Sequence, residues 1–185
     1  MITKLQPLTI ADWDAIPAEE GYRHEIIEGE LFVSRSPGLT HQMVLTNLIF
    51  LIRSYLETNS IGVVVANPGL TLSNFSGVIP DLVFYLTEQR DSIVIDDRLH
   101  GPPALVLEIL SPGSSNTRRD RTSKLQLYAK HGVPEYWIVD PKTMTVEQYV
   151  SRAASLVLLA TLQQDDTLTT AAIPGLSCAV RNIFK

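Results

Sequence analysis

The sequence predicts an α/β (α+β) domain in which a mixed β-sheet is flanked by two main helices. Two observations predict this class: short apolar runs bounded by turn residues recur along the chain, and two longer segments have helical spacing. The chain has 185 residues, of which 45% are hydrophobic and 19% are charged, with no repeat or linker. We therefore expect a single domain over residues 1–185 with one core.

The N-terminal part predicts a short helix, two strands and a long helix. Thr9 and Asp12 form a candidate capping box, and Glu28-Gly29 marks a tight turn between the strands of YRHEIIEGELFVSR. A long amphipathic helix is predicted from Leu39 to Glu57, because its apolar residues recur at spacings of three and four. These residues are Leu45, Leu48, Ile49, Ile52 and Leu56.

The middle of the chain predicts strands. Residues 61–74 form two strands broken at Asn67-Pro68-Gly69, and residues 78–86 form another. A polar excursion from Thr87 to His100 precedes the next strand, PALVLEIL.

The C-terminal part predicts a second main helix and closing strands. Thr117 and Asp120 form a second candidate capping box, opening a helix that runs to about His131 and stops at Gly132. The segments EYWIVDP, TVEQYV and SLVLLATL are closing strands, with turns at Asp140-Pro141 and Ser151.

Composition restricts the function classes. A net charge of −5 argues against a protein that grips nucleic acid with its whole surface, although it allows a local basic site. The single Cys178 cannot form an internal disulfide, and no run approaches the roughly 18 apolar residues of a membrane span. HExxH, GxxxxGK and CxxC motifs are absent. We expect a cytoplasmic protein without membrane segments.

Two acids interrupt apolar strands. Glu108 is the only charged residue from Pro102 to Leu110, and Asp81 interrupts VIPDLVFYL. A buried carboxylate needs a cation or a donor, so each is informative, although Glu108 could face solvent or pair with an arginine and Asp81 could cap a turn. Two such acids in one small domain favour a shared site, and paired carboxylates are typical ligands of Mg²⁺.

The order of several segments resembles a known family. HEIIEGEL, SPGLTHQ, IPDLVF, LVLEILSP and RDRTSKLQLYAKHGVPEYWIVDP follow one another from about Tyr22 to Pro141. Pro80-Asp81 followed by Glu108 resembles the PD-(D/E)xK signature of the restriction-endonuclease-like superfamily. Within it, the chain is similar to a family of putative restriction endonucleases in which the active-site lysine is displaced onto the following helix. The resemblance implies a restriction-endonuclease-like fold and a Mg²⁺-dependent endonuclease, with Mn²⁺ as a substitute, DNA as partner and a homodimer.

The resemblance also assigns residues. It implies that Asp81 and Glu108, with the carbonyl of Ile109, bind the metal, and that Glu25 corresponds to an acid of the first element that binds metal or orients a ligand. Glu25 could instead be an exposed strand residue. His41 is the most plausible functional histidine, for substrate binding, although a helix histidine is more often a cap or structural donor.

One position departs from the superfamily pattern. The lysine expected two residues after the acid is replaced by Leu110, which cannot donate a proton. Lys124 is the best replacement, because a helix opening at Thr117 carries it back over the strand end. The resemblance implies the same displaced lysine. Arg121 and Tyr128 should share its face.

The start of this helix is basic, with Arg118, Arg119, Arg121 and Lys124 within seven positions. Such a cluster suits phosphate, so we take Arg118 and Arg121 as substrate-binding candidates, with an ordinary solvated helix face as the alternative. The function predicted is that of a metal-dependent nuclease, most plausibly a DNA endonuclease. Two alternatives stay open: a catalytically silent interaction protein with a nuclease fold, and a metal-dependent hydrolase of a small nucleotide-like substrate.

Overall fold

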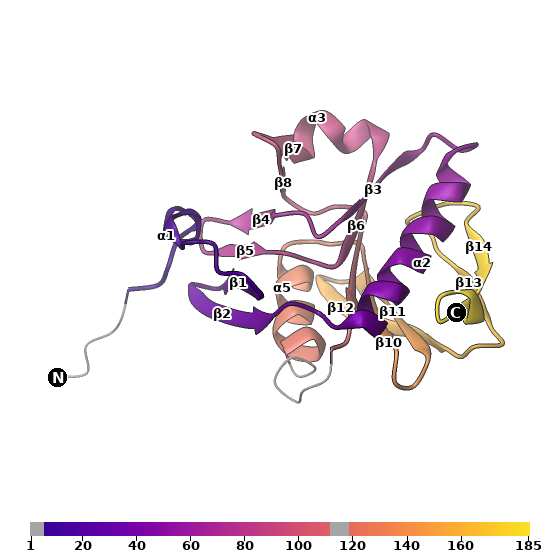
Figure 1. Cartoon of the computed structure of the whole chain (residues 1–185). Helices are drawn as coiled ribbons and strands as arrows, with labels where there is room; N and C mark the ends of the chain where they lie inside the picture. Colours follow the sequence, from indigo (N-terminus) through magenta and orange to yellow (C-terminus); the bar gives the residue numbers. More distant parts are fainter. Residues whose placement is uncertain (1–5, 112–118) are drawn as a thin grey trace.

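A computed structural model describes residues 6–111 and 119–185 of the chain (Figure 1). The N-terminal elements are α1 (Ile10–Ala15), β1 (Tyr22–Ile27), β2 (Glu30–Arg35), α2 (Leu39–Leu56), β3 (Gly62–Ala66), β4 (Leu70–Ser73), β5 (Ser76–Val78) and β6 (Leu82–Leu86). The middle elements are η1 (Thr87–Gln89), α3 (Arg90–Ile93), β7 (Val94–Ile95), β8 (Arg98–His100) and β9 (Leu105–Ile109). The remaining elements are η2 (Arg119–Lys124), α5 (Leu125–Lys130), β10 (Glu135–Asp140), β11 (Thr145–Arg152), β12 (Ser155–Leu162), β13 (Thr167–Thr169), β14 (Ser177–Ala179) and η3 (Val180–Asn182).

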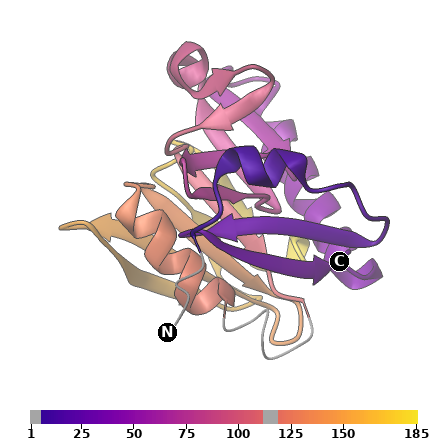
Figure 2. The same cartoon turned by 90° about the vertical axis from the view of Figure 1, so that its left-hand side faces the viewer.

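The central sheet has the strand order β12-β11-β10-β9-β6-β3. It is mixed, because β9 and β10 are parallel while the other neighbours are antiparallel. The parallel pair requires a crossover, which lays α5 back across one face of the sheet. Figures 1 and 2 show α2 and α5 on opposite sides of this sheet. The predicted α+β class, with a mixed sheet and two main flanking helices, is confirmed.

The two faces of β9 pack against different layers. Leu105, Leu107 and Ile109 belong to a core with α2 and the C-terminal segment, whereas Val106 and Leu110 belong to a core with α5 and a second sheet. Side chains alternate between the faces of a strand, so Glu108 lies on the face of α5. The strand thus delivers its one acid beneath the second helix.

The second sheet is a feature that the sequence did not predict. Its order is β2-β1-β5-β4-β8-β7, and it packs on the α5 side of the central sheet. The polar excursion from Thr87 to His100 contributes η1, α3 and the short strands β7 and β8. Its parallel pairing of β4 with β8 joins segments distant in sequence, and such pairing leaves no local pattern.

Several predicted boundaries can be compared with the structure. The long helix ends at Leu56, the capping box of Thr9 and Asp12 is present, and the turn at Glu28-Gly29 has positive φ at both residues. The strand predicted over residues 78–86 is wrong as one unit. It divides around Pro80, which has no N–H for a central ladder, into β5 and β6.

Other boundaries also differ. The turn predicted at Ser151 lies at Ala153 and Ala154, both with positive φ. The second helix begins, within the described residues, as the π-helical turn η2 and continues as α5 to Lys130. Thr117, and with it the second capping box, lies outside the described residues. Within those residues, no helix is long and apolar enough to cross a membrane.

Candidate active site

The site forms where β6 begins and β9 ends. Leu82 of β6 pairs with Leu107 of β9 in antiparallel register, so Asp81 and Glu108 stand next to each other one position further along. The Ile109 amide donates a 2.8 Å hydrogen bond to Asp81 Oδ2. The two acids, 27 positions apart in sequence, therefore line one pocket.

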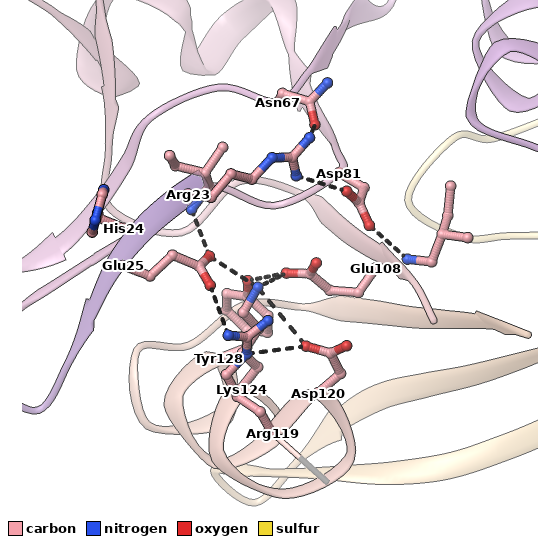
Figure 3. A network of polar contacts seen from close by, with 12 residues as sticks. Arg23, His24, Glu25, Asn67, Asp81, Glu108, Arg119, Asp120, Lys124 and Tyr128 are labelled. Atoms are coloured by element: carbon pink, nitrogen blue, oxygen red, sulfur yellow. Dashed lines mark hydrogen bonds and ion pairs between the residues drawn. The ribbon is translucent and has the colours of Figure 1, made fainter. Parts of the chain in front are cut away.

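Lys124 reaches these acids from the helix. Its Nζ donates a 2.8 Å hydrogen bond to Glu108 Oε1 and lies 2.9 Å from Glu25 Oε1 and 3.9 Å from Asp120 Oδ1 (Figure 3). Only 2% of the lysine side chain is exposed. Tyr128, one turn later, donates from its hydroxyl to the same Glu108 oxygen at 2.8 Å. Because Lys124 is buried and paired with acids, it is not an ordinary solvent-exposed lysine of the helix.

Leu110 faces the same side of β9 as Glu108, where the superfamily pattern would place a lysine. It is buried in the apolar cluster that includes Leu127 and Tyr128. Leu110 therefore occupies this strand position as part of the hydrophobic core, and the ammonium group beside Glu108 comes from Lys124 instead.

Asp81 is held at both oxygens. Arg23 Nη1 donates to Oδ1 at 3.1 Å, and His41 Nε2 lies 2.9 Å from Oδ2, which also accepts the Ile109 amide. Arg23 Nη2 donates in turn to Asn67 Oδ1 at 2.7 Å. Burial acts to raise the pKa of Asp81, but the hydrogen bonds from His41 and Ile109 outweigh it and hold this pKa below its usual value.

Glu25 and Asp120 surround the lysine from the other side. Glu25 Oε1 accepts the Ile79 amide at 2.8 Å, which fixes the carboxylate at the junction of the two sheets. Tyr136 donates from its hydroxyl to the Asp120 carbonyl at 3.2 Å and so anchors η2. One ammonium group thus lies among three carboxylates, those of Glu25, Glu108 and Asp120.

This crowding shifts the pKa values of the cluster. Burial raises the pKa of Glu108 to about 8, although Lys124 acts to lower it, and burial likewise raises the pKa of Asp120. Burial acts to lower the pKa of Lys124, but the surrounding carboxylates, Glu108 first, outweigh it and leave this pKa above its usual value. The lysine therefore stays charged, while burial disfavours the charged form of the acid beside it.

The structure gathers five of the expected site side chains into this pocket, and Ile109 also lines it. The side chains are Glu25, His41, Asp81, Glu108 and Lys124. Arg121 is placed elsewhere, because its Nη1 donates to both carboxylate oxygens of Glu147 at 2.6 Å. Arg118 lies outside the described residues.

Sequence reasoning missed Arg23 and the placement of Asp120 in the pocket. Each had a usable signal: Arg23 stands two residues before Glu25 on the same face of β1, and Asp120 stands four residues before Lys124 on the helix. Neither signal identifies a site until the partner residue is known to be buried.

Comparisons with known proteins agree with this fold. The model of the Uma2 family, described as "Putative restriction endonuclease", matches residues 10–181. The chain belongs to the Uma2 family. A solved structure described as a putative nuclease belonging to DUF820 from Anabaena variabilis ATCC 29413 has a similar fold, with a TM-score of 0.76 and 20% identity. The alignment covers 96% of this chain and 98% of that one. The comparison with curated proteins gave no match.

Uma2 membership and this fold support a nuclease, and they confirm the resemblance seen in the sequence.

Such enzymes use divalent metals, and the side chains of the pocket can be compared with the ligands that these metals require. Within the described residues, no three His, Cys, Asp or Glu side chains are grouped as a metal cage. Mg²⁺, however, is commonly held by one or two carboxylates together with waters and substrate phosphate. Glu108 receives both of its hydrogen bonds from described residues at Oε1, so Oε2 can still accept a ligand. Asp81 Oδ1 accepts one hydrogen bond, from Arg23, and has a further lone pair. These acceptors fit a metal that keeps several waters.

Proposed function

We propose that this Uma2 protein is a metal-dependent nuclease that hydrolyses phosphodiester bonds in DNA, with Mg²⁺ as the metal and Mn²⁺ as a substitute. One observation carries the proposal. Lys124 Nζ lies 2.8 Å from Glu108 Oε1, while Asp81 occupies the adjacent strand. Two acids and a lysine thus form the PD-(D/E)xK set of groups, although Leu110 occupies the strand position at which the superfamily pattern has its lysine.

Each residue of the site has a distinct task in this proposal. Asp81 and Glu108, with the carbonyl of Ile109, would hold the metal, which when bound lowers the pKa of a water molecule and stabilises charge on phosphate oxygens. The Ile109 carbonyl is suitably placed, because the N–H and C=O of one residue leave a strand on the same side and its N–H faces Asp81. Lys124 stays protonated and donates to the charge that develops on the phosphate.

The surrounding residues fix these groups. Tyr128 holds Glu108 by its hydroxyl, and His41 holds Asp81. Glu25 lies 2.9 Å from Lys124 Nζ and so orients the ammonium group. Preorganised donors of this type are effective because they need no rearrangement as charge develops.

The pocket is partly open and is lined mainly by charged side chains. A phosphodiester backbone can lie across its opening and present one phosphate to it.

The test is cleavage by the purified protein with Mg²⁺ or Mn²⁺, on single-stranded, double-stranded and branched DNA and on RNA, beside Asp81→Ala. We expect DNA cleavage that requires the metal and is lost in Asp81→Ala. Cleavage that survives in Asp81→Ala, or no cleavage of any polynucleotide, would remove the proposal and favour the silent interaction protein.

A further inference from the structure

Arg119 presents an uncommitted guanidinium group to the active-site pocket. Its Nη1 lies 3.8 Å from Glu25 Oε2, and its Nε lies 3.7 Å from Asp120 Oδ1. Both are ion-pair distances that exceed the range of a hydrogen bond. Within the described residues, Nε is buried without a hydrogen-bond partner, and the same holds for Asp120 Oδ1. A buried unpaired donor in a native site requires an explanation.

The other arginines near the site are bound or exposed. Arg23 donates from both terminal nitrogens, to Asp81 and to Asn67, and Arg121 donates to Glu147. Arg35 is exposed at the end of β2, on the pocket wall. Arg119 differs from all three because its side chain is 12% exposed, lines the pocket and makes no hydrogen bond to another described residue.

The π-helical turn explains how Arg119 reaches the pocket. Hydrogen bonds in a π-helix run from i to i+5, so residues five apart lie closer to one face than they do in an α-helix. The turn η2 starts at Arg119 and ends at Lys124. It thereby directs both cations to the same pocket, above Glu25 and Asp120.

We propose that Arg119 binds a non-bridging oxygen of the phosphate that is cleaved, beside Lys124. The guanidinium fork suits a phosphate oxygen, and a phosphate at the pocket opening would accept from the terminal nitrogens, while the buried Nε stays beside Asp120. Glu25 and Asp120 keep the guanidinium charge balanced while the pocket is empty of substrate. The proposal rests on the proposed nuclease function and adds the residue that grips the phosphate.

The test compares Arg119→Gln with Arg90→Gln, which removes the same charge from an arginine on α3 that is 67% exposed and outside the pocket. Binding of a fluorescent DNA duplex is followed by anisotropy at several salt concentrations, with Ca²⁺ replacing Mg²⁺. We expect Arg119→Gln to raise Kd roughly tenfold or more. The slope of log K against log salt should fall by about one, as for the loss of one phosphate contact. Arg90→Gln should change Kd by less than about twofold.

A further variant and the activity of the wild type distinguish failure of this inference from failure of the proposed function. Arg119→Lys keeps the charge and should retain the salt slope while binding more weakly than the wild type, and it carries the test if Arg119→Gln fails to fold. A wild type that cleaves DNA while Arg119→Gln and Arg90→Gln bind alike would overturn this inference alone. A wild type that neither binds nor cleaves would overturn the proposed function together with it.

Discussion

Glu108 shows at the scale of one residue why a buried acid identifies a site. The sequence predicted a functional acid in an apolar strand, and the structure surrounds its carboxylate with Lys124, Tyr128 and three further acids. A buried acid whose pKa is raised destabilises the fold once it ionises. An acid of this kind that lines a pocket together with other titratable groups is a candidate functional residue.

This destabilisation gives a prediction on pH. The pKa of Glu108 is about 8 in the folded chain against an ordinary value of 4.5, so the folded state holds an extra proton between these pH values. Stability is therefore full below about pH 4.5 and falls as pH rises through 8. Glu108→Gln cannot ionise, so in EDTA the Tm of this variant minus that of the wild type should rise by roughly 5 °C or more between pH 5 and pH 9. A difference that is the same at both pH values would contradict the account.

Some residues of the site could be predicted from the sequence, and others could not. Asp81, Glu108 and Lys124 were predictable because an acid in an apolar strand is unusual and a missing lysine directs attention to the next helix. Arg23 and Asp120 were not predicted, since an arginine on a strand and an acid near a helix start are ordinary features. Only their place in the lining of the pocket distinguishes them.

Individual elements follow from local patterns where their contacts are local. The helix α2 was predicted to within one residue at its end, because its apolar stripe repeats over the whole length. Pro80 divided a predicted strand, because a proline removes a donor that the ladder of a central sheet needs. The second sheet could not be predicted, since its strands pair across long stretches of chain.

Strand periodicity gives a prediction for Leu110. This residue shares its face of β9 with Glu108, so a lysine introduced there lies on the side of the acids. Leu110→Lys in a Lys124→Met background should restore part of the lost cleavage rate, at a cost in stability because the leucine is buried. Initial rates and thermal melting of the single and double variants measure both effects. A double variant that folds and is no more active than Lys124→Met would show that the two positions are not interchangeable.

The docking of α1 gives a second prediction at this scale. A Cβ on Gly77 would lie 2.4 Å from ring atoms of Trp13, which packs on β5 and donates from Nε1 to the His24 carbonyl at 2.8 Å. Gly77→Ala should cost about 1–3 kcal/mol of unfolding free energy and lower Tm by several degrees. Gly69→Ala is the matched control, because its nearest contacts, including Trp13, are at 4.0 Å. Equal Tm values for the two variants would refute this packing.

The whole molecule assembles the site from separate parts of the chain. The second sheet supplies Glu25, the central sheet supplies Asp81 and Glu108, and the crossover helix between β9 and β10 supplies Lys124. The crossover is forced by the parallel pairing of these two strands, and it returns the helix over the face that carries Glu108. The lysine can therefore be displaced from the strand to the helix without leaving the site.

The measurement that tests this claim most directly compares the wild type with Lys124→Met, a variant of similar side-chain length without the charge. Single-turnover cleavage of one DNA duplex in Mg²⁺ is measured beside Mg²⁺ binding by calorimetry, with melting as the check on folding. We expect the cleavage rate to fall roughly hundredfold or more, as for the loss of a preorganised donor, while Mg²⁺ still binds. An unchanged cleavage rate in a folded Lys124→Met variant would contradict the account and leave Leu110 without a replacement.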